Sequence, residues 1–273
     1  TAFEFSKLPP TELSSKRKHL VCTECEADAF FRKASRNGQA ACFGARAHTI
    51  DCSFASVDIQ DLEFKYTDEE LDNNSSKTIE LELKLNSSED SSNAIKGADN
   101  IGETEDRVKE QFCHEQDSNS HIRRKLKAIL KELVNSTKFR ESSQKIEIEG
   151  RDPTVVSKFF INFSDADKAE DEALHGFWGM LTDARLGSDG SLWLNSGGYE
   201  DVSCVIDSKD VDNFYERYQL EDEEDLAGAL VLLVGPKHTS RNGKKYLRPV
   251  SNNHIDLIIF RNKNDFQSQF FLT

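Results

Sequence analysis

The sequence lacks the features that mark a membrane or secreted protein. No run approaches the roughly 18 consecutive apolar residues of a membrane-spanning helix, and the first residues lack the charged-then-apolar layout of a signal peptide. The motifs G-x-x-x-x-G-K-[ST], H-E-x-x-H and G-x-S-x-G are also absent. These absences argue against a membrane protein and against the familiar nucleotide-binding, zinc-protease and serine-hydrolase sites.

Positive charge is in the minority. The 273 residues include 35 Lys and Arg against 49 Asp and Glu, for a formal net charge of −14. The acid is concentrated, because residues 53–120 carry 18 acidic and 6 basic side chains, whereas residues 121–150 carry 8 basic and 4 acidic ones. The global charge therefore does not decide between an acidic and a basic partner.

Cysteine is scarce along most of the chain, but four of its six cysteines lie close together near the beginning. Cys22 and Cys25 form a C-x-x-C pair, whose spacing lets two thiolates from one tight turn reach the same tetrahedral ion. His48 and Cys52 are spaced as neighbours on one helix face. These four residues predict a closed structural zinc site, since thiolates favour Zn²⁺ over the hard cations. Cys42 is an alternative ligand in place of His48.

Between the two ligand pairs, the sequence predicts a β-hairpin. Residues 29–32 and 41–43 are short runs that flank Asn37-Gly38, a strong hairpin-turn signal. A helical turn is expected over residues 48–52. Buried free cysteines and a redox C-x-x-C centre are the alternatives, although a redox motif is expected near a β-α-β pattern that this segment lacks. Cysteines used as a ligand cluster indicate a reducing, cytoplasmic location.

The middle of the chain alternates between predicted strands and a polar spacer. Strands are expected at residues 56–64 and 78–85, because apolar residues there recur at every second position. Residues 86–118 are rich in Ser, Asn, Asp and Glu and contain few large apolar side chains. Such a composition cannot offset the entropy of ordering the chain, so we expect a flexible acidic linker.

A helix is expected after this linker. Ser120 can cap it, and apolar residues follow at helical spacing from Ile122 to Leu133. Lys and Arg residues on its other face either lie along phosphates or simply face solvent. Two further strands are expected at residues 145–149 and 155–163, separated by a turn that contains Gly and Pro.

The last hundred residues predict a β-rich region with one helix. Strands are expected at residues 176–185, 192–196 and 202–207, then a helix that starts at Ser208, then strands at 226–235, 245–250 and 254–261. The run L-A-G-A-L-V-L-L-V-G-P, the basic loop 236–245 and the run K-Y-L-R-P-V resemble the fourth strand, the next loop and the fifth strand of OB-fold nucleic-acid-binding proteins. The resemblance covers residues 174–260 and implies a five-stranded barrel. A plain β-sandwich is the alternative.

The resemblance also implies where a nucleic acid would bind. Ligands of OB folds cross the second and third strands and are held by neighbouring loops. The candidate contacts are cations for the phosphates and aromatic rings for the bases: Lys237, Arg241, Lys244, Lys245, Trp193, Tyr199 and Tyr246. We therefore expect binding of single-stranded DNA or RNA with weak sequence selectivity and strong salt dependence.

The N-terminal cluster has a resemblance of its own. Its C-x-x-C, the F-x-R stretch after it and the C-F-G-A-R-A-H-x-x-x-C end are similar to the zinc-finger-like head of the competence CoiA family. In that family a nuclease-like domain of the PD-(D/E)xK kind follows. The resemblance points to Glu82 and Lys84, with Asp58 or Asp61 as a second carboxylate, as a metal-dependent site for phosphodiester cleavage. An alternating strand of a charged protein produces the same pattern by chance.

We expect an α+β protein of three parts. These are a zinc-bound hairpin and helix module at residues 1–55, an α+β segment at 56–163 that contains the acidic linker 86–118, and an OB-like antiparallel β-barrel at 164–273. The expected function is nucleic-acid binding rather than catalysis, and Cys25→Ser is expected to lose the metal while leaving binding intact. The alternatives are a protein-interaction adaptor, with module and barrel as docking surfaces, and the nuclease.

Overall fold

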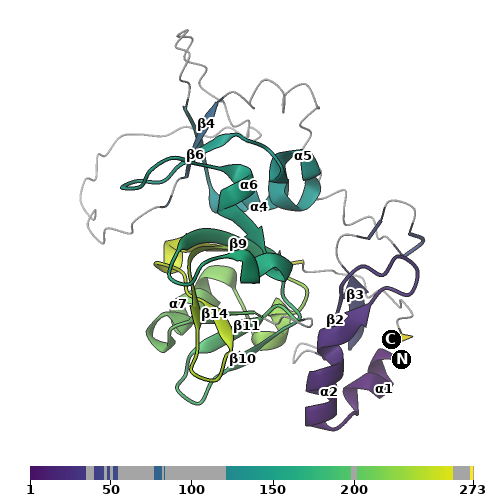
Figure 1. Cartoon of the computed structure of the whole chain (residues 1–273). Helices are drawn as coiled ribbons and strands as arrows, with labels where there is room; N and C mark the ends of the chain where they lie inside the picture. Colours follow the sequence, from purple (N-terminus) through teal and green to yellow (C-terminus); the bar gives the residue numbers. More distant parts are fainter. Residues whose placement is uncertain are drawn as a thin grey trace, which may run out of the picture.

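The computed structural model describes residues 1–34, 40–45, 48–49, 52–54, 77–81, 83, 121–197, 202–260 and 271–272. Within this part the protein is a mixture of helices and sheets, arranged as an N-terminal module, a middle segment and a C-terminal sheet (Figure 1). Several predicted features lie outside the described residues: the strand at 56–64, the linker 86–118, Asp58, Asp61, Glu82, Lys84 and Tyr199.

The N-terminal module is built from short elements around a cluster of aromatic rings. Its elements are α1 (Ala2–Ser6), α2 (Pro10–Lys16), the 3-10 helix η1 (Arg17–His19), β1 (Leu20–Val21), β2 (Ala29–Arg32) and β3 (Cys42–Ala45). The predicted hairpin is confirmed, because β2 pairs antiparallel with β3. The rings of Phe5, Phe31 and Phe43 lie 4.8 to 5.4 Å apart, centroid to centroid, in the small core of the module. Far along the chain, β16 (Phe271–Leu272) pairs with β1.

The middle segment contains a four-stranded sheet with short helices. It comprises β4 (Thr78–Leu81), β5 (His121–Arg124), α4 (Leu126–Asn135), α5 (Thr137–Arg140), β6 (Lys145–Glu147), β7 (Thr154–Val155) and α6 (Val156–Phe159). The strand order is β5-β4-β6-β7, and β4 runs parallel to both of its neighbours. The strands predicted at 78–85 and 145–149 therefore correspond to β4 and β6.

Two sequence predictions in this segment are wrong. The helix expected from Ser120 begins only at Leu126, because the residues before it pair as β5 with β4, where Ile122 lies beside Ile79. The strand expected at 155–163 is divided into β7, α6 and β8 (Phe160–Asn162). In both places long-range pairing and burial outweigh the local apolar pattern, which is a weaker determinant of short strands.

The C-terminal sheet is the largest in the described part of the chain. Its elements are β8, the 3-10 helix η3 (Phe163–Lys168), β9 (Leu174–Met180), β10 (Asp183–Leu186), β11 (Leu192–Asn195), β12 (Ser203–Ile206), α7 (Ser208–Tyr218), η4 (Glu223–Leu226), β13 (Leu230–Thr239), β14 (Lys245–Leu247), η5 (Asn252–His254) and β15 (Ile255–Ile258). The strand order is β10-β11-β12-β14-β13-β9-β8, and β15 pairs with β13. Only β12 with β14 and β8 with β9 are parallel pairs.

The two strands β9 and β10 come from one stretch of chain, interrupted only at Leu181 and Thr182. The Leu181 N–H donates to Ala229 O and the Thr182 N–H donates to Asn195 O, each at 2.8 Å. The first half of the stretch pairs with β13 and the second half with β11. The strand predicted at 176–185 is thus two strands, β9 and β10.

Alternate side chains of β13 belong to two different cores. Val231 and Leu233 lie in the core that β9 to β12 and α7 share, whereas Leu230, Leu232 and Val234 join a second core with α4 and β4. Each fully buried aliphatic side chain contributes about 1.5–3 kcal/mol. The middle segment is therefore held against the C-terminal sheet by a shared core. The predicted boundary at residue 163 falls directly after β8, a strand of that sheet.

Candidate metal centre and candidate nucleic-acid interface

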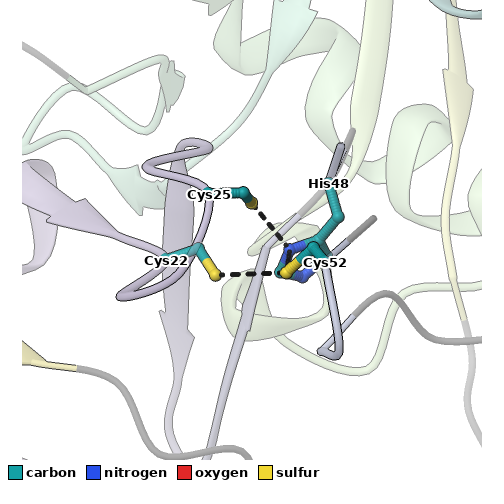
Figure 2. Close-up of side chains that lie close together, drawn as sticks. All are labelled: Cys22, Cys25, His48 and Cys52. Atoms are coloured by element: carbon teal, nitrogen blue, oxygen red, sulfur yellow. Dashed lines mark hydrogen bonds between the residues drawn. The ribbon is translucent and has the colours of Figure 1, made fainter. Parts of the chain in front are cut away.

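Cys22, Cys25, His48 and Cys52 lie together and could hold a metal ion (Figure 2). The Sγ atoms of Cys22 and Cys52 are 3.8 Å apart, and His48 Nδ1 is 3.2 Å from the Sγ atoms of Cys25 and Cys52. All four ligand atoms lie within 4.8 Å of one another. A tetrahedral ion with metal–sulfur bonds of about 2.3 Å separates two sulfur atoms by about 3.8 Å. The group has the size that such an ion requires.

Backbone turns bring the four side chains together. The Glu26 N–H donates to Cys22 O at 2.9 Å and the Cys22 N–H donates to Ala27 O at 2.8 Å, so the chain folds back directly after β1. Glu26 adopts a left-handed conformation with φ of 57°, which closes this turn. On the other side, the Cys52 N–H donates to Thr49 O at 3.0 Å. His48, Thr49 and Cys52 are not helical, and residues 50–51 lie outside the described part.

A carboxylate ties the two ligand turns to each other. Glu24, between the first two cysteines, accepts from Ser53 N at 3.0 Å and from Ser53 Oγ at 2.5 Å. These two donors hold the pKa of Glu24 below its usual range, because they favour the charged carboxylate. The contact fixes the loop that carries Cys52 against the loop that carries Cys25, as outer-shell partners of metal ligands commonly do.

The thiols of the cluster differ in acidity. Burial acts to raise the pKa of Cys25, but hydrogen bonds from the backbones of Thr49 and Ala27 and from His48 outweigh it and bring the pKa to about 6. Burial, with the neighbouring thiols Cys25 and Cys22, raises the pKa of Cys52 to about 11. The thiolate of Cys25 therefore forms readily at neutral pH, whereas the thiolate of Cys52 needs a cation beside it. A divalent metal ion supplies that charge.

The remaining described cysteines are apart from this group. Cys42 lies in β3 opposite Arg32 and does not belong to the cluster. The fold therefore brings together the set that contains His48, and not the alternative set in which Cys42 takes its place. Cys204 is buried in β12, and burial raises the pKa of its thiol. None of the five described cysteines is in a disulfide.

A second candidate site is a row of aromatic and basic side chains on the outer side of the C-terminal sheet. Trp193 of β11 and Tyr246 of β14 have ring centroids 6.2 Å apart, and the ring of His238 stacks on Tyr246 at 5.1 Å. Lys244 Nζ lies 4.9 Å from the Trp193 centroid and Arg248 Cζ lies 5.7 Å from the Tyr246 centroid. We call these five residues the aromatic face.

Strand alternation explains why these side chains share one side. Leu194, Cys204 and Leu247 are neighbours in register across β11, β12 and β14, and all three are buried in the core. The adjacent positions Trp193 and Tyr246 must then point the opposite way, and both are half-buried. Half-buried rings beside cations place aromatic surface and positive charge together.

The predicted contact residues do not all join this face. Lys237 is buried, donates from Nζ to Ala169 O at 2.5 Å and lies 3.1 Å from the Asp171 carboxylate. Lys245 forms an ion pair with Asp167. The reason is that β13 extends to Thr239, so the predicted loop 236–245 shrinks to residues 240–244. Trp193, Lys244 and Tyr246 come together, and Arg241 is exposed in the shortened loop.

Two members of the aromatic face were not among the predicted contacts. His238 and Arg248 lie on the outer side of the β13–β14 hairpin with Tyr246, a placement that residue alternation reveals once the strand bounds are known. Carboxylates hold both: His238 Nδ1 is 2.6 Å from Glu172 Oε1, and Arg248 pairs with Asp207.

A polar cleft opens beside the Arg248 end of the aromatic face. Its volume is about 350 Å³, and its lining includes Asp207, Lys209, Arg248 and Asn252. The cleft lies where α7 begins after β12.

No protein-family model matches the chain, and a search of curated proteins found no match. Among the described residues, the helices are too short and too polar to cross a membrane. We therefore infer function from the geometry of the two candidate sites.

Proposed function

We propose that this protein binds single-stranded DNA or RNA through an OB-like barrel formed by β9 to β14, and that a Zn²⁺ ion holds its N-terminal module. The observation that carries the proposal is the aromatic face, in which Trp193, Tyr246 and His238 form a continuous row with Lys244 and Arg248 over it. The rings stack on bases, and the two cations pair with phosphates.

The strand order supports an OB-like barrel. An OB fold is a five-stranded, partly open Greek-key barrel. Here the stretch 174–186 pairs with β11 through β10 and with β13 through β9, and α7 stands between β12 and β13. The parallel pair β12–β14 brings Tyr246 beside Ser203, next to the strand that carries Trp193.

The chemistry of the face favours single strands and weak sequence selectivity. In a duplex the bases are already stacked on one another, whereas single-stranded bases expose π-faces that any ring can cover. Each base stacked on an aromatic side chain contributes about 1–3 kcal/mol. Binding that relies on Lys244, Arg248 and the exposed Arg185 and Arg241 for phosphate contacts weakens as salt rises, because condensed counterions are released.

The ligand set supports zinc as the metal. Three thiolates and one imidazole make a Cys3His group, which in proteins is typical of closed, structural Zn²⁺ sites. Hard cations such as Mg²⁺ prefer oxygen ligands. The ion would join the turn after β1 to the segment after β3, around a core that is too small to be stable alone.

The proposed binding is tested by titrating labelled single-stranded DNA and RNA oligonucleotides with the zinc-loaded protein at low salt. We expect the double variant Trp193→Ala/Tyr246→Ala to bind at least about tenfold more weakly, because two stacking surfaces are lost. Phe3→Ala is the matched control, since this ring is 65% exposed and lies in the N-terminal module.

Two results would contradict the proposal. One is a wild-type protein that binds neither oligonucleotide at low salt, and the other is an equal affinity of wild type and double variant. Co-purification of a protein partner that resists nuclease treatment would instead favour the adaptor.

A further inference from the structure

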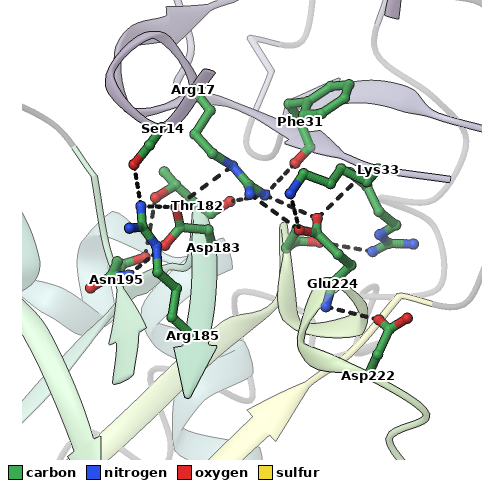
Figure 3. Close-up of polar contacts among 12 residues, drawn as sticks. Ser14, Arg17, Phe31, Lys33, Thr182, Asp183, Arg185, Asn195, Asp222 and Glu224 are labelled. Carbon is green, nitrogen blue, oxygen red and sulfur yellow. Dashed lines mark hydrogen bonds and ion pairs between the residues drawn. The ribbon is translucent and has the colours of Figure 1, made fainter. Parts of the chain in front are cut away.

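The N-terminal module is joined to the C-terminal sheet by a buried arginine. Arg17 is only 4% exposed and donates from Nη2 to Phe31 O in its own module at 2.7 Å (Figure 3). The same guanidinium reaches across to Thr182 O at 3.2 Å, to both carboxylate oxygens of Glu224 at 3.2 and 3.3 Å, and lies 3.6 Å from Asp183 Oδ2. One side chain thus serves both parts of the protein.

These contacts are made where β9 passes into β10 opposite the start of β13. Arg17 donates to Thr182 O, and Arg32 donates from Nη2 to Ala227 O at 2.8 Å. Thr182 and Ala227 are the chain neighbours of Leu181 and Gly228, and the Gly228 N–H donates to Leu181 O. Buried carbonyls need donors, and the two arginines supply them. The ring of Phe30 covers Gly228, where an added Cβ would lie 2.3 Å from the ring. The module therefore completes the hydrogen bonding of this corner.

A chain of polar contacts leads from Arg17 to the aromatic face. Asp183 of β10 accepts from the Asn195 side chain of β11, and the Ser203 hydroxyl of β12 donates to Asn195 Oδ1 at 2.7 Å. Asp183, Asn195 and Ser203 are in register and almost fully buried. Ser203 is in turn the register partner of Tyr246.

We propose that the metal site regulates nucleic-acid binding: the metal-loaded module docks through Arg17, and loss of the metal releases Arg17 and lowers the affinity of the aromatic face. This inference rests on the function proposed above, and it replaces the sequence-based expectation that loss of the metal leaves binding intact, because Arg17 bonds to both the module and the sheet. Arg17 directly precedes the segment that carries Cys22 and Cys25, and Arg32 lies in β2 between the two ligand pairs. Among the described residues, the two ligand turns are otherwise joined by the contact between Glu24 and Ser53 and by the small core of the module, so loss of the metal would loosen the frame that positions these arginines.

Electrostatics explains why release lowers affinity. In the docked state Arg17 and Lys33 lie beside Glu224, while Arg17 and Arg185 lie beside Asp183. Withdrawal of the module removes two of these cations. The carboxylates then repel phosphates that pass along the neighbouring aromatic face, and β10 loses the contacts that fix it. Arg17 is a positioning residue in this scheme.

The experiment compares full-length wild type, Arg17→Met and the control Arg151→Met, each with zinc and after treatment with a chelator. Arg151 is exposed in the turn between β6 and β7. We measure metal content, affinity for labelled single-stranded DNA, and amide hydrogen exchange in β10 and β11. We expect the chelator to lower wild-type affinity about tenfold, as allosteric coupling typically does, and to speed exchange at Thr182. With zinc present, Arg17→Met should bind as weakly as the metal-free wild type, and the chelator should change its affinity little. The reason is that the substitution and the loss of the metal break the same contact between module and sheet.

The proposal is overturned if metal-free wild type keeps its affinity within about twofold and its exchange in β10 and β11 is unchanged. If Arg17→Met does not fold, Arg32→Met replaces it, since it removes the bond to Ala227 O and the contact with the Phe30 ring. Equal affinity to wild type would then count against the docking role. A zinc-loaded wild type that binds no oligonucleotide refutes the proposed function, and the exchange measurement still decides whether metal and sheet are coupled.

Discussion

The ammonium group of Lys244 lies 4.9 Å from the centre of the Trp193 ring, joining the β13–β14 hairpin to the adjoining antiparallel strands. The ring faces the cation on one side of the sheet, while the residues that alternate with it fill the core. In the proposed function, this cation pairs with a phosphate of the bound strand.

Lys244→Glu should weaken single-strand binding about tenfold at low salt, because it removes one phosphate contact and adds a repulsive charge. The affinities of variant and wild type should converge as salt is raised. Lys158→Glu is the control, since this exposed lysine lies on α6 in the middle segment. The measurement is a salt titration of affinity, and parallel slopes for Lys244→Glu and wild type would contradict the assignment.

Lys237→Met and Arg241→Met should have opposite effects, although both positions belong to the same predicted basic loop. Lys237 is buried and bonded to Ala169 O, so its loss should lower the free energy of unfolding by about 1–3 kcal/mol with little effect on binding by folded protein. Arg241 is exposed, so its loss should weaken binding and leave stability within about 0.5 kcal/mol. Denaturant unfolding and affinity measured on both variants separate the two roles.

Cys52→Ser should abolish stoichiometric zinc, because a structural site needs all four ligands and Ser is a poor replacement for thiolate. Cys42→Ser should keep one zinc per chain, since Cys42 lies outside the cluster. Metal analysis of both purified proteins checks this. An equal zinc content in the two variants would mean that the proposed ligand set, which includes Cys52 and excludes Cys42, is wrong.

Gly228→Ala should destabilise the docked module more than Gly243→Ala. Both glycines have positive φ, of 79° and 78°, so both substitutions carry a backbone cost of about 1–2 kcal/mol. Only at Gly228 would the new Cβ collide with the ring of Phe30, whereas nothing lies within 4 Å at Gly243. The difference between the unfolding free energies of the two variants measures the contribution of the contact between module and sheet. If both variants lose the same unfolding free energy, Phe30 moves away at no cost.

Stability should fall as the pH drops below about 6.5. Burial between Phe159 and Phe177 lowers the pKa of His175, so the unfolded chain takes up a proton at a pH where the folded protein does not. Protons then favour the unfolded state, which is the sign expected for a partly buried histidine whose pKa is lower in the folded protein. Denaturant unfolding between about pH 7.5 and 5.5 should show this slope, and His175→Gln should reduce it.

Local signals in the sequence were enough to predict several features. The C-x-x-C and H-x-x-x-C spacings identified all four members of the metal cluster, because short turns fix the reach of residues close in sequence. Asn37-Gly38 with its flanking runs predicted the β2–β3 hairpin, and the helix from Ser208 begins where the sequence placed it. These features depend on interactions within a few residues.

Long-range contacts decided the rest. Residues 121–124 have a helical apolar pattern but pair as β5 with β4, because β4 offers backbone hydrogen bonds that a sequence window does not contain. Lys237 and Lys244 look alike in the loop sequence, yet the extension of β13 buries one and exposes the other.

By itself, the sequence determined the residue types of the candidate metal centre, the charge distribution and the apolar periods of the longer elements, since each is a property of residue type and near-neighbour spacing. Only the tertiary structure decided that Trp193, Tyr246, His238 and Lys244 share a face, and that Arg17 joins the N-terminal module to Asp183 and Glu224. Those contacts link strands and a module that are distant along the chain. They exist because burying two shared cores fixes the register of every strand and so the direction of every side chain.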